Sequence, residues 1–403
     1  MNKSILFCMC MAVCSGWGAV PWVSGVSMSR YGNCRITYTL NEAPGIVTFD
    51  ILTNGVSIGA QNLTNAVGDV NKVVQPGSRL IQWDASEIWA GHKFTTPCVS
   101  AKVTVWPENA PPDYLAVDLT KADCPVTYYA SEDALPWGKI WTNPKYKGDV
   151  LLMRRIKASH VLSFMGSPET EANHLADGRE TRRMCTLTND FYIGVYPMTF
   201  RQYYLLNQGP TTTEARLSPV ITVTYNQLRY AANNYDNTAL PVNFPTTSRT
   251  FVGGSSFLKA WRDKTGLTLD LPTSAQWEFA CRAGTDTPLY WDDGSMGKLE
   301  IISQLGYNHD YEVGTKGGNS WNLFDMIGNC YEWCLDYYED NLTADAVTDP
   351  LGPTARADLG RKVRGYHAND IHKRSAFVGM RQYNLTGDAN AVYVGFRLCI
   401  TLE

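Results

Sequence analysis

The stretch WNLFDMIGNCYEWCLD, from Trp321 to Asp336, decides the fold together with VGFRLC at Val394 to Cys399. Both segments set aromatic and aliphatic residues among glycine, asparagine and cysteine without a regular repeat. The same mixture of residue types, with few helical patterns, is found in the whole chain from Asp149 onward. It indicates an α+β domain whose backbone is largely irregular, a kind of domain that disulfides or bound ions often hold together.

Three short helices are predicted in this domain by one start signal, a threonine followed three residues later by a glutamine. The threonine hydroxyl can accept from a backbone N–H of the first turn while the glutamine reaches back, the reciprocal arrangement of a capping box. A further helix is predicted over Ser255–Lys264, closed by Gly266. The three pairs are Thr199 with Gln202, Thr224 with Gln227, and Thr273 with Gln276.

Upstream, the pattern changes to short alternating strands. The segments CRITYTL, GIVTFDIL, SRLIQW and AKVTVW alternate apolar with polar residues between Gly, Asn and Pro, which is typical of a small sandwich of immunoglobulin or fibronectin-III type. A chain of 403 residues exceeds the size at which one core keeps growing, so two domains are expected. We place the β-sandwich at residues 20–107, a linker or bridge at 108–148, and the irregular α+β domain at 149–403.

Residues 1–19 have the pattern of a secretory signal peptide. Lys3 gives a positive start, Ile5 to Val13 form a short apolar run, and small residues follow up to Ala19. The run is far shorter than the roughly 20 residues of a spanning helix, so no membrane span is expected. A lipoprotein attached through Cys14 is the alternative. We expect the protein to be secreted, periplasmic or displayed on the cell surface.

The charge balance disfavours one class of partner. The net charge is −4, and no run rich in lysine or arginine occurs, so little in the chain would neutralise the phosphates of a nucleic acid. The sequence also contains no H-E-x-x-H, G-x-S-x-G, phosphate-loop or dinucleotide-binding motif. We expect no nucleic-acid partner, and no common catalytic motif assigns an activity.

A series of motifs in residues 149–403 resembles the formylglycine-generating enzymes, the sulfatase-modifying factors built on a C-type-lectin-like fold. In chain order they are RRIKASHVLSFMGSP, LTNDFYIGVYPMTFRQY, PVITVTYNQ, LPTSAQWEFACRAGT, the GN-x-x-EW segment and GFR. The resemblance implies the same fold here. The whole chain is therefore predicted to be an α+β protein, an N-terminal β-sandwich followed by a C-type-lectin-like domain.

The reactive centre that the resemblance implies is missing from this chain. In the oxygen-using members, two thiolates between the arginine-glycine turn and the GFR strand bind copper(I), and one attacks a substrate cysteine. Here no cysteine occurs between Leu335 and Leu398, and Asp370 and Lys373 stand near the positions of the pair. Copper is therefore not expected, and no residue is assigned a catalytic role.

Two histidines, His367 and His372, lie beside Asp370 in the same interval. Imidazole and carboxylate are ligand types for zinc or iron. Loop spacing does not fix their geometry, however, and the simpler interpretation is that they are polar loop residues.

The resemblance also implies calcium, which family members hold at the GN-x-x-EW turn through backbone carbonyls and a glutamate. Ca²⁺ takes about six to eight oxygen ligands and tolerates an irregular turn that aims several carbonyls inward. The alternative is that Glu332 pairs with Arg364 or Arg397. The matching residues are Ile327, Gly328, Asn329, Cys330 and Glu332.

Export would permit disulfides, and the cysteine count is compatible with them. Of the 11 cysteines, those outside the predicted signal peptide are even in number, and sequence alone does not fix their pairing. The resemblance implies a bridge from Cys281 to Cys399, although Cys399 comes one position later than its family counterpart. A disulfide between Cys34 and Cys98 could stabilise the β-sandwich.

Three functions from different classes remain open. The first is a secreted binding or display protein, an inactive family member whose protein, peptide or glycan ligand contacts the C-terminal loops at 366–373 and 382–393. The second is an enzyme that modifies an exported protein without the two cysteines, and the third is a structural component of the cell envelope. The ligand-binding residues predicted for the first are Trp321, Arg364, Tyr366, His367, Asn369, Asp370, His372 and Lys373.

Overall fold

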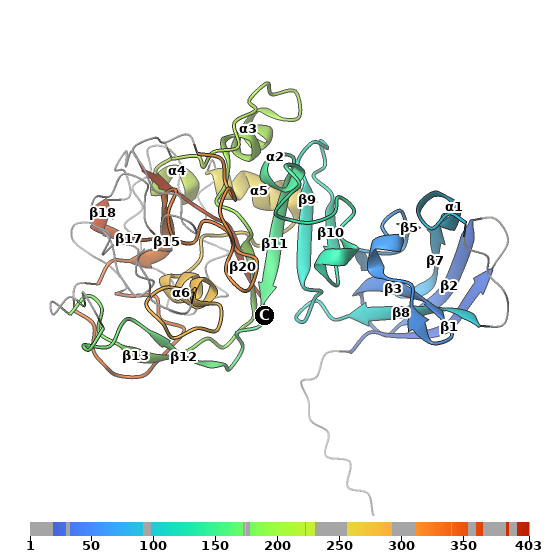
Figure 1. The fold of residues 1–403 in the computed structure, drawn as a ribbon, viewed down its shortest axis with the longest axis horizontal. Helices are drawn as coiled ribbons and strands as arrows, with labels where there is room; N and C mark the ends of the chain where they lie inside the picture. Colours follow the sequence, from blue (N-terminus) through green and yellow to red (C-terminus); the bar gives the residue numbers. More distant parts are fainter. Residues whose placement is uncertain are drawn as a thin grey trace, which may run out of the picture.

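The computed structural model describes residues 19–29, 33–91, 98–171, 174, 178–221, 223–229, 256–291, 311–339, 341–353, 360–365, 384–386 and 393–402. Strands from the first hundred residues, blue in Figure 1, gather at one end of the molecule, and the later elements, green to red, form a larger second body. The protein is a mixed α+β protein in which strands predominate.

The described strands form five sheets. The first body contains β1 (Trp22–Ser29), β2 (Cys34–Asn41), β7 (Gly77–Trp83) and β5 (Val67–Gly68) in that order, and a second sheet of β4 (Val56–Ser57), β3 (Gly45–Thr53), β6 (Val73–Val74) and β8 (Val99–Trp106). The second body contains a central sheet of β10 (Val126–Tyr129), β9 (Tyr114–Asp118), β11 (Val150–Ile156), β14 (Phe191–Gly194) and β20 (Cys399–Thr401). Its smaller sheets are β12 (Leu162–Met165), β13 (Arg183–Thr186) and β16 (Val347–Thr348), and β18 (Asn384–Thr386), β17 (Gly360–Gly365), β15 (Tyr331–Tyr337) and β19 (Val394–Gly395).

The two sheets of the first body share one hydrophobic core. Alternate residues of β2, from Cys34 to Leu40, are buried, and they belong to the same apolar cluster as Val47 and Ile51 of β3. Each strand predicted between residues 34 and 106 is present. The period-2 pattern therefore does place one face of each sheet on a common core.

Residues 108–148, expected to be a linker, instead contribute two strands to the central sheet. β9 pairs with β11 on one side and with β10 on the other. Leu115 and Val117 face one apolar cluster while Tyr114 and Ala116 face another, so this strand is buried on both sides. Such a strand lacks polar alternation, which is why its sequence pattern is inconspicuous. The second body therefore begins near Tyr114 and not at residue 149.

The predicted capping boxes are all present. In each, the threonine Oγ1 accepts from the glutamine N–H, and the glutamine Oε1 accepts from the threonine N–H. The helix predicted to close at Gly266 does so, with Ser256 as its N-cap. The described helices are η1 (Ala60–Asn62), α1 (Ala85–Ile88), η2 (Glu132–Ala134), α2 (Lys145–Gly148), α3 (Phe200–Gln208), α4 (Tyr225–Arg229), α5 (Phe257–Thr265) and α6 (Ser274–Arg282).

Candidate functional site: a buried charge framework beneath the C-terminal loops

Most of the predicted ligand-binding residues lie outside the described part of the chain. These are Tyr366, His367, Asn369, Asp370, His372 and Lys373, together with most of the second predicted loop. The structure does describe where both loops leave the scaffold. Tyr331 of β15 pairs with Gly365, which precedes the first loop, and with Val394, which follows the second. The Tyr331 N–H also donates to the Tyr393 carbonyl over 3.0 Å. One residue therefore anchors the start of one loop and the end of the other.

Glu332, the next residue of β15, forms a fully buried ion pair with Arg397. Arg397 Nε and Nη2 donate to the two carboxylate oxygens, each over 2.7 Å, and Trp277 Nε1 donates to Oε2 over 2.7 Å. The same guanidinium also donates to the carbonyls of Gly194 and Phe324. Of the alternatives left open by the sequence, the structure thus contains the pairing with Arg397. Bidentate pairs of this kind are strong and directional.

The residues of the predicted calcium site already hold several hydrogen bonds within the protein. Both oxygens of Glu332 are engaged by donors, and the Gly328 carbonyl accepts from the Cys330 N–H over 2.9 Å. Asn329 lies at a positive φ of 65° and donates through Nδ2 to the Tyr311 carbonyl. Among the described residues, no cluster of three His, Cys, Asp or Glu side chains has the arrangement of a metal site. The turn also carries a carboxylate oxygen that the sequence analysis did not name.

Asp325 supplies such an oxygen at the same turn. Its side chain is buried, its φ is 54°, and Oδ2 accepts from the Gly314 N–H over 2.6 Å. Within the described part of the chain, its Oδ1 has no hydrogen-bond partner. Burial raises the pKa of Asp325 to about 6. A buried carboxylate oxygen without a donor is costly unless a cation or water meets it. The signal in the sequence is the single acid within the apolar run LFDMI.

Arg364, expected to line a ligand groove, is instead buried inside the domain. Nε donates to Ser274 Oγ over 2.8 Å and Nη2 donates to Glu278 Oε2 over 2.9 Å. The other oxygen of Glu278 accepts from Arg282 and from the Gly166 N–H. The two arginines thus share one carboxylate of α6. Because only 1% of Arg364 is exposed, it positions β17 against α6 and does not present a charge to a ligand.

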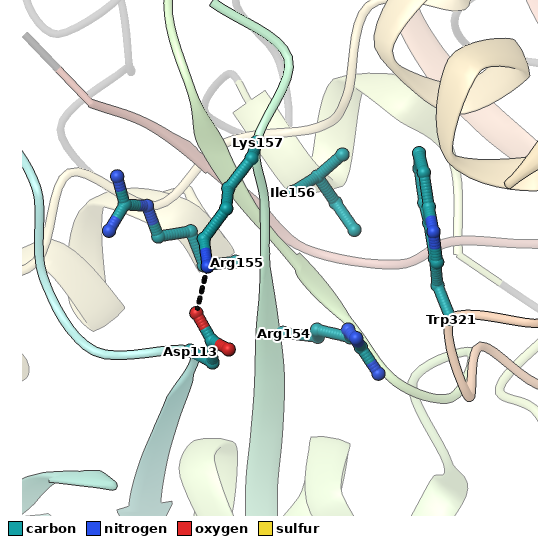
Figure 2. Close-up of a pocket in the computed structure, with 6 residues that line it drawn as sticks. All are labelled: Asp113, Arg154, Arg155, Ile156, Lys157 and Trp321. Carbon is teal, nitrogen blue, oxygen red and sulfur yellow. Dashed lines mark ion pairs between the residues drawn. The ribbon is translucent and has the colours of Figure 1, made fainter. Parts of the chain in front are cut away.

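Trp321, the other described member of the predicted ligand set, is half-buried. Its ring packs against Phe279, with centroids 5.5 Å apart, and the backbone N–H of Trp321 donates to Asn319 Oδ1. It borders two hollows. The first, the cationic hollow, has a volume of about 130 Å³ and is lined by Asp113, Arg154, Arg155, Ile156, Lys157 and Trp321, as Figure 2 shows.

The second hollow that Trp321 borders, the apolar hollow, has a volume of about 390 Å³. Its lining includes Val161, Leu162, Phe164, Phe279 and Trp321, and it also includes Lys157 of the cationic hollow. Arg364 is not among the residues that line either hollow.

The predicted disulfides are not formed. All the cysteines outside residues 1–18 are free in the structure. Cys399 Sγ instead donates to Gln276 Oε1. Cys34 is buried in the core of the first body whereas Cys98 is exposed.

Five buried cysteines of the second body are also poorly suited to thiolate chemistry. Cys185, Cys281, Cys330, Cys334 and Cys399 are all buried. Burial raises the pKa of Cys185 to about 12 and raises the pKa of the other four as well. A thiol with a raised pKa supplies little thiolate, the form that attacks a substrate or binds copper(I).

No helix in the described part of the chain has both the length and the apolar character that crossing a membrane requires.

Comparison with known proteins identifies the family of the second body. The sulfatase-modifying factor enzyme 1-like domain matches residues 159–402, more than half of the chain. The chain belongs to this family. Two sulfatase-modifying factor relatives are the formylglycine-generating enzymes of Streptomyces coelicolor and Mus musculus, 30% identical over 159 residues and 26% identical over 141 residues. These matches cover 34% and 32% of this chain and 50% and 38% of those proteins, so the chain spans half or less of the length of either relative.

A solved structure, that of PvdO from Pseudomonas aeruginosa, is also similar. It is 18% identical, covers 62% of this chain and 95% of its own, and superposes with a TM-score of 0.46. This chain has no cysteine between Leu335 and Leu398.

Proposed function

We propose that this protein is an exported binding or display protein on a sulfatase-modifying factor scaffold that does not carry out cysteine oxidation. Its ligand, a protein, peptide or glycan, contacts the loops at 366–373 and 382–393. The observation that supports a common binding surface is the shared anchor at Tyr331, which holds one end of each loop. Loops carried by a rigid strand are the usual place for recognition residues.

The positions and pKa values of the cysteines support the proposal that this chain does not carry out the family reaction. The interval that carries the reactive pair in the family has no cysteine here, and the pKa of each buried cysteine of the second body named above is raised. Copper(I) requires soft thiolate ligands. Copper is therefore not part of this proposal.

Calcium remains part of the proposal, with a revised ligand set. Asp325 Oδ1 is the best available oxygen because it is buried without a donor, and the carbonyls of the turn from Ile327 to Cys330 lie next to it in the chain. Glu332 then neutralises Arg397 and is not a ligand. Hard oxygen donors in an irregular turn match the preference of Ca²⁺. The ion would stabilise the turn that precedes Tyr331.

The first body is consistent with the proposed binding or display function. Two packed sheets with one core are consistent with an immunoglobulin or fibronectin-III type of sandwich, which we propose as an accessory module. Residues 1–19 would direct the chain out of the cytoplasm.

The direct test is an incubation of the purified chain with a cysteine-containing sulfatase peptide, with and without copper, followed by mass spectrometry. We expect no loss of the thiol mass. Copper-dependent conversion to formylglycine would refute the proposal and support an enzyme of the family. Conversion without copper would point to a mechanism that does not use the paired cysteines.

A further inference from the structure

The cationic hollow and the apolar hollow are neighbours on the surface. Both are lined by Lys157 and by Trp321, so these two side chains lie at the border between them. In Figure 2 the indole ring of Trp321 stands across the cationic hollow from Arg154 and Lys157. We call the combined feature the Trp321 groove. It is built from β11, β12, the end of α6 and residue 321, and it includes none of the loops considered above.

The apolar part of the Trp321 groove is unusually exposed. β12 alternates so that Leu162 and Phe164 face outward, 63% and 38% exposed. Met184, 42% exposed, is the register partner of Phe164 on β13, and Val161 is 44% exposed. Single exposed apolar residues are ordinary, but a contiguous group beside a cavity marks a surface that another molecule covers.

The cationic part carries more positive than negative charge. Arg154 donates to the neutral Tyr114 hydroxyl over 3.1 Å, and within the described part of the chain no carboxylate lies at ion-pair distance from it. Lys157 is 65% exposed and is held by Asp113 over 2.9 Å. Arg155 is already paired with Asp190 outside the groove. Asp113 is the one acid in the lining of the cationic hollow against Arg154, Arg155 and Lys157, and this balance favours a negative group on the occupant.

We propose that the Trp321 groove docks an extended segment of another protein in which a carboxylate side chain lies next to apolar side chains. The carboxylate is received by Arg154 and Lys157, and the apolar residues cover Leu162, Phe164 and the Trp321 ring. The apolar side chains Val161, Leu162, Phe164, Phe279 and Trp321 of the larger hollow favour apolar side chains on the occupant, and a glycan is the alternative that the test below separates from a peptide. This inference does not depend on the function of the C-terminal loops.

The test is a selection of random short peptides on the full chain, alongside an array of acidic glycans, followed by affinity measurements on matched variants. Lys157→Glu and Leu162→Ser change mainly exposed side chains, so both should fold. The first is matched by Lys139→Glu, because Lys139 is also 65% exposed and held by one aspartate. The second is matched by Val56→Ser, at a residue that is 68% exposed on the first body.

We expect the selected peptides to combine acidic with apolar residues. Lys157→Glu and Leu162→Ser should each weaken their binding by about tenfold, whereas the two control variants should leave it within about twofold. Melting midpoints equal to wild type would establish that the losses are local. The proposal is overturned if no peptide is selected, if the selected peptides lack acidic residues, or if control and test variants behave alike. Lys157-dependent binding of acidic glycans without peptide binding would also overturn it, in favour of a carbohydrate site.

Discussion

The buried pair of Glu332 and Arg397 predicts a large loss of stability in Glu332→Gln. The substitution keeps the volume and one acceptor oxygen, but it leaves Arg397 as a charge without its carboxylate at a site with no exposure. The guanidinium cannot move to water easily, because it also donates to the carbonyls of Gly194 and Phe324. Removing one partner of a buried ion pair costs about 3–5 kcal/mol, and we expect a value in that range.

This loss should appear as a fall in the melting midpoint of the second body. For domains of this size, each kcal/mol shifts the midpoint by about 2–4 °C, so the expected fall is about 6–20 °C. The measurement is thermal unfolding followed by circular dichroism, in excess chelator and again in calcium. The matched control is Glu214→Gln, whose partner Arg216 is 50% exposed; a surface pair of this kind is worth about 0–1 kcal/mol.

Two results would contradict this reasoning. If Glu332→Gln loses no more stability than Glu214→Gln in chelator, the Arg397 pair does not stabilise the fold. If the variant is destabilised only when calcium is present, the Glu332 carboxylate serves the ion and not Arg397.

Three further predictions concern single side chains. Asp325→Asn should abolish the rise in melting midpoint that calcium gives the wild type, and an unchanged rise would exclude Asp325 as a ligand. Burial raises the pKa of Glu171 from its ordinary 4.5 to about 7, so its contribution to stability is fully present below about pH 4.5 and is lost as the pH rises through about 7. Denaturant titrations should show a flatter pH dependence in Glu171→Gln, and equal slopes would count against the raised pKa. Gly166→Ala should cost about 2 kcal/mol or more, because φ is +77° and the new Cβ would lie 2.5 Å from the Thr181 carbonyl oxygen, whereas Gly317→Ala has open space and should be nearly silent.

The local features of the fold could be predicted from the sequence. The capping boxes depend on residues three apart, so Thr273 and Gln276 suffice to start α6 wherever it packs. The strands of the first body follow from alternation alone, as in β2. The family assignment rested on the order of several short motifs, and the match to residues 159–402 confirms it.

The features that depend on distant contacts could not be predicted. Arg364 follows a charged, strand-like run, and nothing near it in sequence reveals that its partner, Glu278, lies 86 residues earlier on α6. The bridge from Cys281 to Cys399 depends on which way each side chain points, which a shift of one residue in a strand reverses. Asp325 could not be singled out from the sequence. What distinguishes it is a buried carboxylate oxygen without a hydrogen-bond donor, and this depends on the surrounding packing and not on the residue type.

The membership of β9, β10 and β11 in the central sheet bears on how this protein can be divided for experiments. All three strands precede residue 159, where the family match begins. A fragment cut at that boundary would strip β11 from β14, its partner from Met153 to Ile156. The remaining strand would then present an open hydrogen-bonding edge and bare apolar side chains, which is a template for aggregation. A recombinant piece that starts near residue 108 would keep the sheet intact, so the segment between the two bodies belongs to the smallest unit worth expressing.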